Sequence, residues 1–232
     1  MIERIPRVKA RRVSIGGTRF YEVEGVYYVS VTSVLQVVGK PELVRWAKAV
    51  ALDAVASALS GRDAFTRDEL EAALLSARSE PERQRDEAAA RGSALHRELA
   101  SSLRAHPAAA RVLERLALTP LAYEVTLVSR RYGFAGTCDL VAEDAGGTLA
   151  LVDWKSGSVW PEHALQAGAY AVALDEMTGE TISSGYVVSL ANDEPEVYAV
   201  DLDAAGDGFL AALGLFRALK TESLLERFGG GR

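Results

Sequence analysis

The sequence has a single cysteine, Cys138, among its 232 residues, so no disulfide framework can hold the fold together. It also lacks an apolar run of roughly 18 residues, the length that a membrane-spanning helix needs. The first 20 residues carry six basic side chains and no apolar segment of the kind found in secretory signals. We therefore expect no membrane association and a reducing, cytoplasmic compartment, in a bacterial or phage-infected cell.

A glycine-rich phosphate loop, G-x-x-x-x-G-K-[ST], is missing as well, so we expect neither a motor nor a nucleotide cofactor in this chain. The formal net charge of −6 argues against a protein that coats polyanions. Hydrophobic residues make up 49% of the chain, which is enough for a sizeable core. The length and composition therefore favour one folded domain, or one domain with an appendage, over several domains.

The charge is unevenly distributed. Residues 1–20 carry a net charge of +5, whereas residues 175–208 hold nine acidic residues and no basic one. The basic segment is either a solvated tail or a contact for a polyanion, and composition leaves both readings open. We expect the acidic segment to face away from any anionic substrate.

The hydrophobic period separates helices from strands. Apolar and polar residues alternate over 12–30, which predicts short paired strands with turns at Gly16-Gly17 and Glu24-Gly25. The remaining predicted elements are helices over 41–59, 66–77 and 80–104, an antiparallel meander of strands over 121–129, 134–143 and 148–154, a helix over 160–177, strands over 181–190 and 196–201, and a helix over 205–226.

The end of the strand over 148–154 carries unusual charges. Asp153 and Lys155 are two residues apart, so they project from one face and interrupt an apolar run. Asp139 lies on the preceding strand, and the hairpin-like connection lets its carboxylate face that of Asp153. Two facing carboxylates repel each other unless a cation lies between them.

Carboxylate oxygens are the ligands that Mg²⁺ and Mn²⁺ prefer, commonly together with water and substrate phosphate oxygens. A cation there lowers the pKa of a water. Lys155 is placed to orient or deprotonate that water, or to stabilise the pentacovalent phosphorus that its attack forms. The pattern therefore indicates phosphodiester hydrolysis with one or two Mg²⁺ or Mn²⁺ ions. The alternative is a structural ion pair between Asp153 and Lys155.

Other residues are weak candidates by themselves. His96 follows Gly92-Ser93 on a helix and is more often a core or surface residue than a ligand. Glu124 lies on the strand before Asp139. Gln166 and Tyr170 share one helix face at i, i+4 spacing, where packing is the common role.

Taken in order, these residues resemble the PD-(D/E)XK nuclease superfamily, in its branch of RecB-like and phage or mitochondrial single-strand exonucleases. The matching blocks are Arg91-Gly92-x-x-x-His96, Glu124, Gly136-x-x-Asp139, Asp153-x-Lys155 and Gln166-x-x-x-Tyr170, together with the N-terminal segments 28–35 and 40–46. The resemblance spans about residues 20–200. Its iron–sulfur subfamilies need four cysteines, which this chain does not have.

The resemblance implies a role for each matched residue. Asp139 and Asp153 would ligate the metal together with the main-chain carbonyl of Trp154. His96 would contribute to metal binding, and Lys155 would act on the attacking water. Glu124 would support a second metal or the water, while Gln166 and Tyr170 would orient Lys155 or touch the cleaved strand.

The resemblance also implies an α/β (α+β) fold of the restriction-endonuclease-like type, with a mixed central sheet flanked by helices. We expect a substrate-guiding hairpin and helical layer over residues 1–80 and the nuclease core over residues 81–232. In the N-terminal layer, Trp46 could stack a base, although core packing is the commoner fate of such a tryptophan. The other candidate substrate contacts there are Lys40, Arg45, Ser30, Thr32 and Ser33, of which Ser30 or Thr32 could equally be a helix N-cap.

The leading hypothesis is a metal-dependent DNA nuclease, an exonuclease acting on single strands or ends in replication, repair or recombination, with a separate helicase or recombination protein as a candidate partner. The alternatives are a structure-specific endonuclease and a catalytically inactive DNA-binding subunit of a helicase–nuclease complex. Intact Asp139, Asp153 and Lys155 argue against the inactive subunit.

Overall fold

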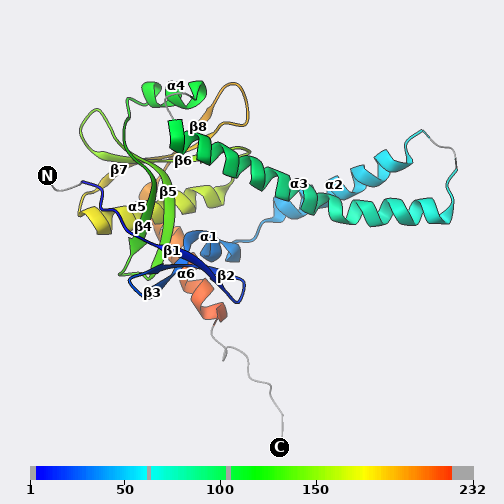
Figure 1. Ribbon diagram of the computed structural model, residues 1–232, viewed down its shortest axis with the longest axis horizontal. Coiled ribbons are helices and arrows are strands. Elements are labelled where there is room, and N and C mark those ends of the chain that lie inside the picture. Colours follow the sequence, from blue (N-terminus) through cyan, green and yellow to red (C-terminus); the bar gives the residue numbers. More distant parts are fainter. Residues whose placement is uncertain (1–3, 62–63, 103–105, 221–232) are drawn as a thin grey trace, which may run out of the picture. The chain divides into compact units, whose positions relative to one another are not determined.

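The computed structural model describes residues 4–61, 64–102 and 106–220 (Figure 1). The strands are β1 (Arg11–Ile15), β2 (Thr18–Val23), β3 (Val26–Ser30), β4 (Thr119–Ser129), β5 (Phe134–Glu143), β6 (Leu149–Lys155), β7 (Ile182–Ser189) and β8 (Glu196–Val200). The helices are α1 (Val31–Val34), the 3-10 turn η1 (Leu35–Val37), α2 (Pro41–Leu59), α3 (Arg67–Ser102), α4 (Pro107–Arg115), α5 (Pro161–Thr178) and α6 (Leu202–Lys220).

All of these strands belong to one mixed sheet. The strands β4, β5 and β6 form the predicted antiparallel meander. At the start of β5, β3 pairs in parallel with Phe134 and Ala135, on the edge of β5 opposite β4. After β6 the chain crosses over through α5 and returns as β7, parallel to β6, with β8 antiparallel at the edge. The predicted mixed α/β sheet flanked by helices is therefore confirmed.

The first three strands form two tight hairpins, as the alternating pattern predicts. At both turns the two central residues have positive φ, with 54° and 75° at Gly16-Gly17 and 52° and 79° at Glu24-Gly25. This backbone matches the right-handed twist of paired strands, and glycine adopts it without a Cβ clash. Glycine is therefore the residue that sets both turns.

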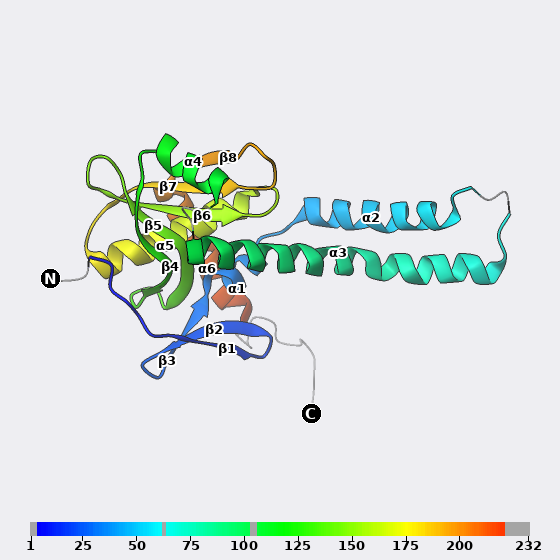
Figure 2. The same cartoon turned by 45° about the horizontal axis from the view of Figure 1, so that its top comes forward.

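The helix α5 covers one face of the sheet, and α6 packs against α5 (Figures 1 and 2). The two helices approach so closely that a Cβ added to Gly168 would lie 2.4 Å from the backbone of Ala205 and Gly206. A large cluster of buried apolar residues lies between α5, α6 and the sheet, and within it Phe134 packs edge-on against Phe209. This core fixes the strand ends that carry the candidate site.

Contacts divide the chain into two units, one of residues 1–38 with 96–232 and one of residues 39–95. Within the second unit α2 and the first part of α3 run side by side (Figures 1 and 2). The bounds of α2 match the predicted helix over 41–59, with Pro41 in its first turn. The substrate-guiding layer over residues 1–80 and the nuclease core over residues 81–232 stay predictions.

The predicted break between helices at residues 77 and 80 is wrong, because α3 is one helix with Pro81 inside it. A proline inside a helix removes a hydrogen bond and costs about 3 kcal/mol in isolation. Here Glu80 accepts hydrogen bonds from Arg83 and Gln84, and Arg83 also pairs with Glu87. The contacts of Glu80 span the proline, and the pair of Arg83 and Glu87 supports the turn that follows it.

The helix α4 was not predicted. Its N-cap is His106, whose Nδ1 accepts a hydrogen bond from the Ala109 N–H at 3.3 Å, and histidine is not one of the usual capping residues. The predicted closing helix appears as α6, and its residues 221–226 lie outside the described residues. Among the described helices, none has the length and apolarity to cross a membrane.

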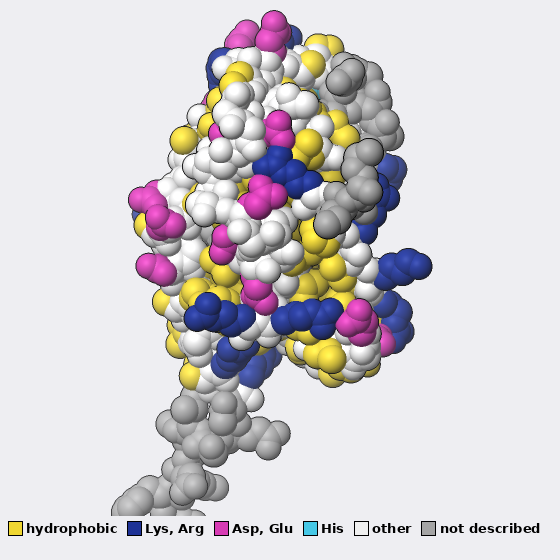
Figure 3. All heavy atoms as spheres, turned by 90° about the vertical axis from the view of Figure 1, so that its left-hand side faces the viewer, with side chains coloured by type: hydrophobic (Ala, Val, Ile, Leu, Met, Phe, Trp, Pro, Cys, Tyr) yellow, Lys and Arg dark blue, Asp and Glu magenta, His cyan; other side chains and the backbone are white. Residues whose placement is uncertain are grey.

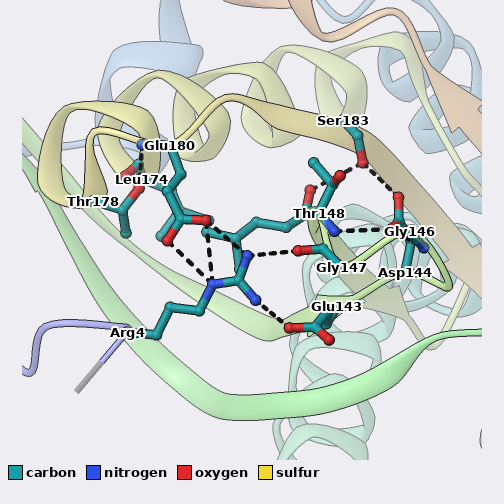
Figure 4. Close-up of polar contacts among 11 residues, drawn as sticks. Arg4, Glu143, Asp144, Gly146, Gly147, Thr148, Leu174, Thr178, Glu180 and Ser183 are labelled. Atoms are coloured by element: carbon teal, nitrogen blue, oxygen red, sulfur yellow. Dashed lines mark hydrogen bonds and ion pairs between the residues drawn. The ribbon is translucent and has the colours of Figure 1, made fainter. Parts of the chain in front are cut away.

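An arginine near the start of the chain ties the N-terminal segment to the sheet (Figure 4). The Arg4 guanidinium donates to Glu180 Oε2 at 2.7 Å and to the Gly147 carbonyl at 2.8 Å, and it also pairs with Glu143. Together with buried Ile5, these contacts hold residues 4–5 against the end of β5 and the β5–β6 turn. The basic segment is therefore not a wholly solvated tail.

Candidate active site

The strands β5 and β6 bring Asp139 and Asp153 together. The pair Leu140–Val152 is in register, so the aspartates lie opposite each other one step further along the ladder. The Asp139 Oδ2 atom accepts a hydrogen bond from the Trp154 N–H at 2.8 Å. Burial and the nearby Asp153 raise the pKa of Asp139. Without a cation, the charge of Asp139 is therefore disfavoured opposite Asp153.

Asp153 is 1% exposed, and its Oδ2 is the one buried side-chain polar atom of the described residues without a hydrogen-bond donor. Lys155 Nζ lies 2.5 Å from this oxygen as an ion pair, but not in hydrogen-bond geometry, and it donates to Gln166 Oε1 at 3.0 Å. Because this buried oxygen has an ion pair but accepts no hydrogen bond, it keeps the capacity to bind a metal ion. This atom therefore fits the hypothesis of a metal ligand.

A chain of hydrogen bonds holds Lys155 from the helix side. Gln166 on α5 accepts from Lys155, and its Nε2 donates to the Tyr170 hydroxyl at 2.7 Å and to Asp153 Oδ1 at 3.3 Å. Tyr170 is buried, and burial together with Asp153 raises its pKa well above the ordinary value, so it stays neutral. Its ring lies over Gly136, where an added Cβ would be 2.5 Å from Cε1.

His96 and Glu124 complete the cluster. The ligand atoms of His96, Glu124 and Asp139 all lie within 4.8 Å of one another, and His96 Nδ1 is 2.9 Å from Asp139 Oδ1. This hydrogen bond raises the pKa of His96 against the opposing effect of burial. Burial and Asp139 raise the pKa of Glu124. The carboxylates and the imidazole together form a donor set suited to Mg²⁺ or Mn²⁺.

The backbone at Glu124 is strained, with a φ of +48° in the middle of β4. The register places it opposite Asp139, between the pairs Tyr123–Leu140 and Val125–Cys138. A cavity of about 510 Å³, lined by residues 4–8 and 121–126, opens beside it. The strain therefore occurs where the carboxylate joins the cluster and can be reached from outside.

The predicted substrate contacts near α1 are already hydrogen-bonded within the fold. Ser30 is the N-cap of α1 and accepts from the Ser33 N–H at 3.1 Å, as one of the two readings of this segment expected. Ser33 Oγ in turn accepts from the Arg19 N–H at 3.0 Å. Thr32 is exposed and lies 3.1 Å from Ser30 through their hydroxyls. A substrate contact by these residues stays a prediction.

Lys40, Arg45 and Trp46 belong to the unit of residues 39–95 and not to the unit that carries the carboxylates. Trp46 is 37% exposed, so the core-packing alternative does not hold among the described residues. Arg45 pairs with Glu42 one turn earlier. Their contact with a substrate stays a prediction, as does the Trp154 carbonyl as a ligand.

Sequence reasoning missed a basic group beside the cluster. Arg12 on β1 donates to Thr137 Oγ1 at 2.9 Å, and Thr137 lies two residues before Asp139 on β5. The alternation of side chains along β5 could have indicated Thr137 as a neighbour of the site, because it places Thr137 and Asp139 on one face. That alternation does not predict the contact of Arg12 with Thr137, because it says nothing about which distant strand lies nearby.

Comparison with known proteins gives one match in sequence and several in structure. A family model described as the PD-(D/E)XK nuclease superfamily matches residues 42–221, more than half of the chain. No curated protein matches the sequence.

The similar solved structures include an alkaline exonuclease, LHK-Exo, from Laribacter hongkongensis, which is 16% identical over 83% of this chain and 91% of that chain, with a TM-score of 0.37. A structure of LHK-Exo in complex with dAMP is 19% identical over 75% of this chain and 89% of that chain, with a TM-score of 0.36. A third, SSO0001, is 14% identical over 85% of this chain and 78% of that chain, with a TM-score of 0.35.

Proposed function

Because the chain belongs to the PD-(D/E)XK nuclease superfamily, we propose that it is a divalent-metal-dependent deoxyribonuclease that hydrolyses phosphodiester bonds at the cluster of Asp139, Asp153 and Lys155. The observation that carries the proposal is the convergence of these residues with His96 and Glu124. Two closely placed carboxylates, one of which has an oxygen without a hydrogen-bond donor, stand next to a lysine that Gln166 holds.

The residues divide the work by their chemistry. Asp139 and Asp153 would hold the cation, and the ligand atoms of His96 and Glu124 lie within 4.8 Å of that of Asp139. A bound Mg²⁺ or Mn²⁺ supplies positive charge that lowers the pKa of a water and offsets the charge of the phosphate. The cation would also offset the repulsion between these two closely placed carboxylates.

Lys155 acts on the water and the phosphate. Gln166 accepts one of its hydrogens, so the ammonium group keeps a fixed direction and its remaining hydrogens can orient the water or contact a phosphate oxygen. Attack of the water oxygen forms a new P–O bond, and the proton that the water loses passes to solvent. The ester P–O bond breaks, and the leaving oxygen takes up a proton from solvent to become a hydroxyl. Tyr170 holds Gln166 through its hydroxyl and so keeps Lys155 in place.

The preferred substrate is single-stranded DNA or DNA ends. Support for this part comes from the spacing of the motif residues and from segments 28–35 and 40–46, which resemble single-strand exonucleases. Since the sequence lacks a motor motif, a separate helicase or recombination protein would deliver the strand.

The proposal is tested with end-labelled linear DNA, single- and double-stranded, in the presence of Mg²⁺ or Mn²⁺. We expect Lys155→Ala to lower the rate by about 10²- to 10³-fold, the range for loss of one fixed donor that stabilises charge in the transition state. Asp207→Asn on the exposed surface of α6 is the matched control and should cleave as the wild type does. Equal rates in all three proteins would exclude the proposed site.

Closed circular single-stranded DNA separates the proposed exonuclease from an endonuclease. An exonuclease that needs an end leaves the circle intact while it degrades the linear strand. Cutting of the circle would replace the proposal by a structure-specific endonuclease. Retained DNA binding without cleavage in any divalent metal would indicate an inactive subunit.

A further inference from the structure

The side chain of Arg12 is fixed by neutral partners. Its Nη2 donates to Thr137 Oγ1 at 2.9 Å, and its Cζ lies 5.5 Å from the centroid of the Tyr21 ring. The Tyr21 hydroxyl is itself 3.0 Å from Thr137 Oγ1, so the three side chains form one connected group. Stacking and one hydrogen bond orient the guanidinium and leave most of its five donors unused by these partners.

This group lies next to the carboxylate cluster. Thr137 and Asp139 are two residues apart on β5, so they share a face at a spacing of about 7 Å. On β4 Thr126 pairs with Thr137, and Glu124 lies two residues before Thr126. Although burial and Asp139 raise the pKa of Glu124 overall, the charge of Arg12 is among the effects that lower it.

Two other basic residues of the N-terminal segment are neutralised within the fold. Arg4 pairs with Glu143 and Glu180, and Arg11 pairs with Glu22 across the first hairpin. On the face that Figure 3 shows, lysine and arginine side chains lie in separate groups with acidic and apolar side chains between them. The net charge of +5 in residues 1–20 therefore overstates what that segment offers to a substrate.

We infer that Arg12, held by Tyr21 and Thr137, binds a backbone phosphate of the substrate strand beside the phosphate that is hydrolysed. The inference rests on the proposed nuclease function and adds a binding subsite to it. Arginine suits this role because its planar fork matches two phosphate oxygens. An arginine already held in place also loses less entropy when it binds.

The site needs such a contact because its own charges oppose the substrate. Glu124, Asp139 and Asp153 repel a polyanion, and a bound cation offsets this only locally. The guanidinium of Arg12 is fixed at Thr137, two residues from Asp139 along β5. A positive charge at this place would set the register of the substrate on the carboxylate cluster. Contacts to phosphate position a nucleic acid without reading its sequence.

The test compares Arg12→Gln with Arg11→Gln, which removes the same charge from the adjacent exposed position. Binding of an end-labelled single-stranded oligonucleotide is measured in Ca²⁺ over a range of salt concentrations, with a gel to verify that the strand stays intact. For Arg12→Gln we expect about a ten-fold loss of affinity. The slope of log affinity against log salt should fall by about one, with little change for Arg11→Gln.

A second measurement leaves the protein unchanged. Single phosphates of the oligonucleotide are replaced in turn by neutral methylphosphonates, counted from the labelled end. One position should weaken binding to the wild type and to Arg11→Gln, yet have no further effect on Arg12→Gln. A merely structural role of Arg12 would not produce this position-specific coupling.

The outcomes separate the inference from the proposed function. Equal affinity and slope for Arg12→Gln and Arg11→Gln, or a scan without a coupled position, would overturn the inference even if the wild type cleaves DNA. A wild type that binds but never cleaves would contradict the proposed function and leave the Arg12 comparison decisive for binding. A wild type that does not bind DNA would overturn both.

Discussion

Gly136 lies beneath the ring of Tyr170, and this contact makes the orientation of Lys155 sensitive to a single methyl group. In Gly136→Ala, the new Cβ would lie 2.5 Å from Tyr170 Cε1 and 3.1 Å from Val31 Cγ2. Ordinary contact begins near 3.4 Å, so the ring would have to move by about 0.9 Å, the difference of 3.4 and 2.5. Tyr170 is 2% exposed, so the ring has little room to move.

Two effects of Gly136→Ala can be given magnitudes. Overpacking of a buried site costs about 1–3 kcal/mol of unfolding free energy. Movement of Tyr170 also disturbs its hydrogen bond to Gln166, which holds Lys155. A displacement of about 1 Å at a catalytic group can lower turnover by about 10²-fold.

Urea unfolding and cleavage of labelled single-stranded DNA measure the two effects of Gly136→Ala separately. Gly136→Ala combined with Tyr170→Leu should regain stability, because the smaller side chain relieves the clash, but it should not regain activity. Tyr170→Phe is the control that keeps the ring and removes only the hydroxyl. Wild-type stability and turnover in Gly136→Ala would refute the packing argument.

Three further predictions concern the cluster, the helix contact and the cysteine. Asp139→Asn should melt no lower than the wild type without metal, because it removes one of two opposed buried carboxylates. It should also lose the stabilisation of about 2.7 kcal/mol expected when a ligand is present at 100 times its Kd, and thermal unfolding with and without Mn²⁺ checks both results. Gly168→Ala should destabilise the protein by about 3 kcal/mol, because its Cβ would meet the backbone of Gly206. Gly214→Ala in α6 has open space around it and should stabilise the protein by up to about 1 kcal/mol. Urea unfolding of the two variants measures both free-energy changes. Burial raises the pKa of the Cys138 thiol well above its ordinary value, so a thiol reagent should react with it only when the protein unfolds. Rapid labelling of the native protein would contradict this burial.

Much of the fold follows from local signals in the sequence. Pro41 and Gly61 bracket α2. The turns at Gly16-Gly17 and Glu24-Gly25 set the two hairpins of β1, β2 and β3. These signals act within a few residues, so they can be read without knowing the rest of the chain. The predicted boundaries differ from the structure at α3, where the helix continues through Pro81, and at α4, where an unusual cap begins a helix.

The site was predictable only in part. The spacing of Asp153 and Lys155 on one strand, and a hairpin back to Asp139, indicate paired carboxylates from sequence alone. The bond from Arg12 to Thr137, by contrast, joins residues 125 positions apart. The close approach of Tyr170 to Gly136 and the positive φ of Glu124 also arise from tertiary packing, which no local pattern encodes.

The central claim is that Asp139 and Asp153 bind a divalent cation. Calorimetric titration of Mn²⁺ into the wild type, Asp153→Asn and the control Asp207→Asn tests this most directly. The account predicts binding by the wild type and by Asp207→Asn, and loss of that binding in Asp153→Asn. Equal Mn²⁺ affinity in all three proteins would contradict it.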